Sequence, residues 1–137
     1  MNTEQLWNRF YAKLGHLCYA IAACDKKVTP AEIQKVKELV KKDWVNLESS
    51  LDPYGSDAAY QIEILFEWLE ENNPSYEVSF EEFSDFAREN PQFFIPVIKE
   101  RVIKTADRIA AAFAGKNKSE LTLLFKLHKV LNIKHAV

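Results

Sequence analysis

The chain has 137 residues, of which 47% are hydrophobic and 28% are charged. This ordinary globular composition excludes a wholly disordered chain, a collagen-like chain and a disulfide scaffold, and the length suits a single domain over residues 1–137. With only 3 glycines and 5 prolines, helices joined by short loops are favoured over many hairpins.

The charge is unevenly distributed along the chain. Between residues 48 and 90 there are 12 acidic residues and 1 basic residue, whereas the segments on either side are net positive. We expect this acidic middle segment to be the interaction surface, for cations or for a basic protein partner. Specific nucleic-acid binding is not expected, because the net charge is −2 and only a few of the basic residues are arginines.

Two helices are predicted in the first third of the chain. Apolar residues recur every three or four positions from Leu6 to Ile21, which predicts an amphipathic helix from about residue 3 to residue 24, capped by Asn2 or Thr3. Thr29 and Glu32 then form a capping box around Pro30, which predicts a second helix that reaches Trp44.

A loop over residues 47–56 and a third helix are predicted next. Ser56 is expected to cap this helix, which should run to about Glu71 and stop at Asn72-Asn73-Pro74. The apolar positions expected on its inner face are Tyr60, Ile62, Leu65, Trp68 and Leu69. The segment Val78–Phe83 repeats the start signal at Val28–Ile33 with an offset of 50 residues, so Ser79 and Glu82 are expected to cap a fourth helix.

The last third of the chain predicts two further helical stretches. Asn90-Pro91 opens one, with a kink or break at Pro96, where proline is too deep to be the first helical residue. It should end at Gly115, and Asn117 should cap the final helix. The predicted fold is therefore all-α, a compact bundle of six or seven helices built from two pseudo-repeated helix-loop-helix halves, with Val28 and Val78 adjacent in space.

The segment Ala20–Ile33 resembles the TerB-like tellurite-resistance family. That family shows an apolar helix, then Ala-Asp-Gly, an aliphatic residue, Ser or Thr, and a Glu three positions further on; Asp25, Val28, Thr29 and Glu32 match this pattern, and Lys26 stands where glycine is usual. The resemblance implies a compact helical domain with pseudo-repeated halves, a bacterial stress-response function and metal binding without established catalysis.

A degenerate EF-hand-like loop is a second candidate feature. With Val78 at position 8 of such a loop, side-chain oxygens occupy positions 1, 3, 5, 9 and 12 through Glu71, Asn73, Ser75, Ser79 and Glu82. The same register on the first loop places Asp25 at position 5 and Glu32 at position 12. These seven residues are the candidate ligands for Ca²⁺ or another divalent cation. Tyr76 at position 6, where glycine is needed, argues against the site, and a capping box beside a solvated Glu71 is the open alternative.

Catalysis is not expected. No histidine is paired in the sequence with a nucleophile, and neither Cys18 nor Cys24 has a Cys-x-x-Cys partner. Two cysteines too far apart along one helix for a disulfide predict free thiols and a cytoplasmic location, and no apolar run is long enough to span a membrane. The predicted function is a non-enzymatic binding domain; the alternatives are a metal-free interaction module or a lipid-anchored envelope protein, because Ile21–Cys24 is similar to a lipoprotein cleavage box. The partner and the oligomeric state stay open.

Overall fold

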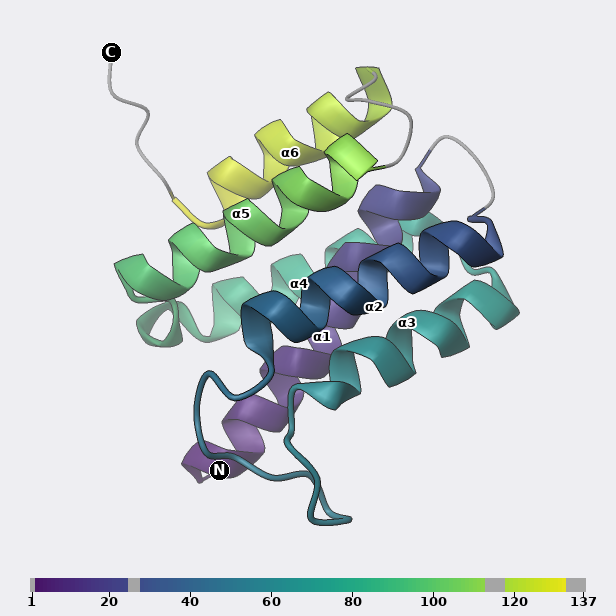
Figure 1. Ribbon diagram of the computed structural model, residues 1–137. Helices are drawn as coiled ribbons and strands as arrows, with labels where there is room; N and C mark the ends of the chain where they lie inside the picture. The colour runs from purple at the N-terminus through teal and green to yellow at the C-terminus, as the bar shows by residue number, and fades with distance from the viewer. Residues whose placement is uncertain (1, 25–27, 113–117, 133–137) are drawn as a thin grey trace.

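The computed structural model describes residues 2–24, 28–112 and 118–132, and these form six α-helices and one 3₁₀-helix. The helices are α1 (Thr3–Ala23), α2 (Pro30–Trp44), α3 (Tyr60–Asn72), α4 (Tyr76–Glu89), the 3₁₀-helix η1 (Pro91–Phe93), α5 (Pro96–Ala112) and α6 (Lys118–Val130). The all-α prediction is confirmed (Figure 1).

The long helix α1 is the centre of the bundle. It packs against α3, α4 and α5, whereas α2 packs against α3 and α5, and α6 packs against α5 and α4. In Figure 1, α6 and α3 lie on opposite sides of the bundle, with α1, α2 and α5 between them. From Phe10 to Ala22, α1 is almost continuously buried, because neighbouring helices cover it on several sides.

Gly15 allows α1 and α3 to approach each other closely. A Cβ atom at this position would lie 3.0 Å from the carbonyl oxygen of Ile62 and 3.1 Å from the Cβ atom of Leu65. Any larger residue would therefore push the two helices apart, so this glycine sets their spacing.

Aromatic rings fill the end of the core between α1, α4 and η1. The ring of Phe10 lies 4.9 Å from that of Phe93, 5.4 Å from that of Trp44 and 5.8 Å from that of Phe94, measured between centroids. Most of these pairs are tilted or edge-to-face, which are the arrangements that the charge distribution of aromatic rings favours.

A buried polar network joins α2 to α5. The indole N–H of Trp44 donates to Thr105 Oγ1 at 2.9 Å, and the Thr105 hydroxyl donates to Asp43 Oδ2 at 3.0 Å. Arg108 forms an ion pair with the same carboxylate, and Arg101 donates to the backbone carbonyl of Asp43 at 2.7 Å. The buried carboxylate is thus fully compensated, as burial of a charge requires.

Both predicted caps near the N-terminus are confirmed. The Asn2 side chain accepts from Gln5 N at 2.8 Å, and Thr29 Oγ1 accepts from Glu32 N at 3.2 Å. In each case the third helical residue completes a capping box by accepting from the backbone of the cap. The cap expected at Asn117 and the helix end expected at Gly115 lie outside the described residues.

The predicted start of the third helix at Ser56 is wrong. Residues 50–58 instead form a loop closed by backbone hydrogen bonds from Asp52 N to Ser56 O at 2.8 Å and from Ala58 N to Ser50 O at 2.9 Å. Helix α3 begins only at Tyr60, and no side chain caps it. The loop is favoured over a helix extended to Ser56 because its hydrogen bonds satisfy the same backbone groups that helical hydrogen bonds would otherwise satisfy.

The predicted cap at Ser79 is also wrong. Helix α4 begins at Tyr76, and its N-cap is Ser75, which lies four residues before Ser79. Val78 is therefore inside a helix and more than half exposed, whereas Val28 precedes α2 and is buried. The two valines do not occupy equivalent positions in the two helix-loop-helix segments.

The break near Pro96 is confirmed, although its details differ. The short η1 helix ends at Phe93, and α5 begins at Pro96 itself. Proline is thus the first helical residue here, where its missing N–H breaks no helical hydrogen bond. Among the described residues, no helix combines the length and the apolar character needed to cross a membrane.

Candidate functional site

The predicted ligands Glu71, Asn73 and Ser75 lie around the turn between α3 and α4. Asn73 ends α3 in the left-handed conformation, with a φ of 51°, and its side-chain oxygen lies 3.2 Å from the Tyr19 hydroxyl. Ser75 Oγ accepts from Glu77 N at 3.2 Å, and Glu71 is exposed. Two of these three side chains are thus already used to shape the turn.

Ser79 and Glu82 lie further along α4 and point toward α1. Ser79 is buried, and Glu82 Oε2 lies 2.7 Å from Lys13 Nζ. This contact with the Lys13 ammonium holds the pKa of Glu82 below its ordinary value. Since residues 76–89 are helical, Ser75 and Glu82 are separated by roughly 10 Å along the helix axis. The EF-hand-like register therefore does not bring its oxygens together.

Of the two candidate ligands of the first loop, the structure describes only Glu32. Asp25 lies outside the described residues, and Glu32 closes the capping box of α2 by accepting from Thr29 N at 3.0 Å. Within the described parts of the chain, no group of three or more His, Cys, Asp or Glu residues is placed to hold a metal ion. Cation binding by the seven residues stays a prediction, which titration calorimetry with Ca²⁺ tests.

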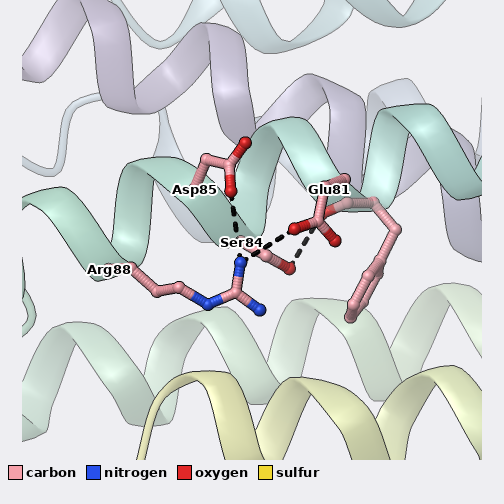
Figure 2. Close-up of polar contacts among 5 residues, drawn as sticks. Glu81, Ser84, Asp85 and Arg88 are labelled. Atoms are coloured by element: carbon pink, nitrogen blue, oxygen red, sulfur yellow. Dashed lines mark hydrogen bonds and ion pairs between the residues drawn. The ribbon is translucent and has the colours of Figure 1, made fainter.

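The acidic residues on the outer side of α4 are largely paired within the helix. Figure 2 shows Arg88 between Glu81 and Asp85, with its Nη1 atom 2.9 Å from Glu81 Oε1 and 3.2 Å from Asp85 Oδ1. The Ser84 hydroxyl donates to the carbonyl of Phe80 at 2.9 Å. The single positive charge of Arg88 is thus shared between the carboxylates of Glu81 and Asp85.

Helix α3 presents a different surface. All of its charged residues are glutamates, and Ile64 and Trp68 are 56% and 55% exposed. Residues three or four positions apart share one face of a helix, so these two apolar side chains lie on one stripe with Glu67 and Glu71. We call this stripe the α3 surface, and its members are Ile64, Glu67, Trp68 and Glu71.

Trp68 was expected on the inner face of this helix, and that prediction is wrong because its side chain is exposed. The buried residues of α3 are Ile62, Phe66 and Leu69. Apolar residues occur on most sides of α3, so the spacing alone does not decide which of them face inward. The signal that could have identified Trp68 is its position between Glu67 and Glu71, on the stripe with the exposed carboxylates.

Lysines of α2 lie along one edge of the α3 surface. Lys37 forms an ion pair with Glu67, and burial raises the pKa of the neighbouring Glu63 carboxyl, although Lys41 and Lys37 oppose that rise. No ion pair of Glu71 with another described residue is present. Glu71 is therefore the carboxylate of this stripe that is left for a partner, and it lines a hollow together with residues of α2.

The two cysteines are not candidates for reactive thiols. Cys18 and Cys24 are both buried, and no disulfide joins them. Burial raises the pKa of the Cys18 thiol to about 12, so it stays protonated near neutral pH and is a poor nucleophile.

Comparisons with known proteins add no relative. No family model, no curated protein and no solved structure matches this chain.

Proposed function

We propose that this chain is a non-enzymatic protein-binding domain, and that its α3 surface receives a basic segment with an apolar side. The proposal includes the stress-response role that the TerB-like resemblance implies. The observation that carries it is the pair Ile64 and Trp68, one turn apart and more than half exposed, on a helix whose charged residues are all acidic.

The apolar pair supplies the affinity in this proposal. Tryptophan is enriched among the residues that contribute most to protein interfaces, because it buries a large area with little loss of side-chain freedom. In the free chain, the exposed apolar surface of Trp68 and Ile64 contacts water. An apolar partner that covers this surface removes it from water, which is favourable.

The carboxylates supply the selectivity. Glu67 and Glu71 flank the apolar pair, and charge complementarity mainly determines which partners approach and in which orientation. A shallow hollow of about 290 Å³ lies beside the stripe, lined by Lys37, Glu67, Glu70 and Glu71 among others. It offers room for a long basic side chain of the partner.

Calorimetric titration with a synthetic helical peptide of leucine and lysine tests the proposal. We expect Trp68→Ala to weaken binding by on the order of tenfold or more, as loss of an interface anchor does. Tyr54→Ala is the control, because Tyr54 is an aromatic residue that is 91% exposed in the loop before α3, and it should leave the affinity unchanged.

A second peptide, in which glutamate replaces every lysine, tests the charge requirement. We expect no binding of this peptide, since its glutamates would face the carboxylates of the α3 surface and like charges repel. Equal affinity of the wild type and Trp68→Ala for the lysine peptide, or equal affinity for both peptides, would contradict the proposal.

A further inference from the structure

Helix α6 carries a stripe that resembles the α3 surface with the opposite charge. Leu121 and Phe125 are 50% and 56% exposed and lie one turn apart. Lys118 and Lys129 share their side of the helix by the same spacing of three or four residues. We call this stripe the α6 surface, and its members are Lys118, Leu121, Phe125 and Lys129.

The positive charge of this surface is not cancelled by α6 itself. Glu120 is the acidic residue of the helix, and it is buried. The Lys129 ammonium lies 4.7 Å from the ring centroid of Phe125, so a cation covers the edge of the exposed apolar pair. A partner that suits this stripe must be apolar and acidic together.

The α3 surface has those properties. Each stripe offers two large apolar side chains four residues apart beside charges of one sign, namely Glu71 and the Lys37-paired Glu67 on α3, and Lys118 and Lys129 on α6. Opposite charges around matching apolar pairs are the arrangement that favours one partner and disfavours like pairing. Two α3 surfaces, or two α6 surfaces, would instead repel each other.

The two stripes cannot meet within one molecule. Helix α3 packs against α1 and α2, whereas α6 packs against α5 and α4, and the two helices lie on opposite sides of the bundle in Figure 1. In two separate copies nothing in the fold prevents the contact.

We propose that the α3 surface of one copy binds the α6 surface of a second copy. This inference rests on the proposed function and names the partner of the same surface. Because the two contacting patches differ, a bound pair keeps one free patch of each kind for further copies, and such head-to-tail contacts build open chains unless the rotation closes a ring.

A hollow next to the α6 surface has room for a large side chain of the partner copy. It has a volume of about 610 Å³ and lies between α4 and α6. Its lining combines apolar residues with charged residues of both signs, among them Phe80, Glu77, Glu81, Leu123, Lys118 and Lys129. An indole such as that of Trp68 is a large, rigid side chain with an apolar body and a polar N–H, so it suits a hollow with this mixed lining.

Sedimentation equilibrium of the full chain over a range of concentrations tests the inference. At low salt we expect the average mass to rise with concentration above that of the monomer. At high salt the rise should weaken, because exposed charges are screened beyond about 3 Å at 1 M ionic strength. Trp68→Ala and Phe125→Ala should each remain monomeric, with unchanged circular dichroism because both side chains are largely exposed.

The mixture of the two variants is the sharpest measurement. Trp68→Ala retains an intact α6 surface, and Phe125→Ala retains an intact α3 surface, so the mixture should form a one-to-one dimer with twice the monomer mass and nothing larger. A wild type that stays monomeric at every concentration, or a mixture that stays monomeric, would overturn the inference. If the lysine peptide still binds in that case, the proposed function stands and only its partner is wrong.

Discussion

At the residue scale, the ion pairs of the chain differ in how far they are buried. Asp43 is buried and is held by Arg108 and by the Thr105 hydroxyl. Asp85 is exposed, and its ion pair with Arg88 lies in water on the outer side of α4 (Figure 2). Removal of one member of a buried pair leaves an uncompensated charge, whereas exposed pairs contribute little.

Asp43→Asn is therefore expected to be costly. It removes the charge that compensates Arg108 and places an amide against it, so the free energy of unfolding should fall by about 2–3 kcal/mol. The control Asp85→Asn should cost less than about 1 kcal/mol. Urea unfolding of both variants at an unchanged m-value measures the difference, and equal losses would show that the Asp43 network is not a main source of stability.

At the element scale, the helix starts depend on a few hydrogen bonds. Thr29 and Glu32 exchange two of them at the start of α2, with donor–acceptor distances of 3.2 Å and 3.0 Å. The first turn of any helix has backbone N–H groups without helical partners, and a cap satisfies them. This is why the α2 start is recognisable within four consecutive residues.

Thr29→Ala should lower the free energy of unfolding by about 1 kcal/mol, because alanine cannot accept the hydrogen bond from Glu32 N. Thr122→Ala is a matched control inside α6, where the hydroxyl donates to the Lys118 carbonyl at 2.8 Å. It should change stability by less than about 0.5 kcal/mol, since that carbonyl belongs to the helix and alanine is the better helix former. Thermal unfolding by circular dichroism separates the two, and a larger loss for Thr122→Ala would contradict the assignment of Thr29 as the effective cap.

Capping signals alone did not identify every helix start. Ser79 and Glu82 have the spacing of a capping box, yet α4 begins at Tyr76, and Glu82 instead contacts Lys13 of α1. Both Ser75 and Ser79 are plausible caps in the sequence. Packing of Tyr76 against the core favours the longer helix, and a local pattern does not contain that information.

At the scale of the whole molecule, the core is continuous from α1 to α6. Buried side chains of α6, such as Leu124 and Leu127, belong to the same cluster as Phe10 and Trp44. A chain of this size with a continuous core is expected to unfold in one cooperative step, as the predicted single domain over residues 1–137 would.

Urea unfolding followed by two probes tests this expectation. Far-ultraviolet circular dichroism reports all helices, and tryptophan fluorescence includes the fully buried Trp44. The two transitions should coincide in midpoint and slope. An early loss of helix signal with an unchanged fluorescence spectrum would show that part of the bundle unfolds independently.

The candidate surface was less predictable than the fold. The segregation of acidic residues between 48 and 90 is visible in the sequence, but its availability is not, because Lys13, Lys37 and Arg88 pair with several of the carboxylates. Two of these partners are distant in sequence from the residues they neutralise. The exposed Trp68 was likewise missed, since α3 is apolar on more than one side.

Local sequence patterns were enough to predict the helical class, the capped starts of α1 and α2, the break before α5 and the division of charge along the chain. These features depend on residues within a few positions of one another, where capping and helical spacing act. Three other features became known from the folded chain alone: which face of α3 is buried, which carboxylates are paired, and that α3 and α6 lie on opposite sides of the bundle. Those outcomes depend on contacts between distant segments, such as the close approach of α3 to Gly15, and a local pattern does not encode them.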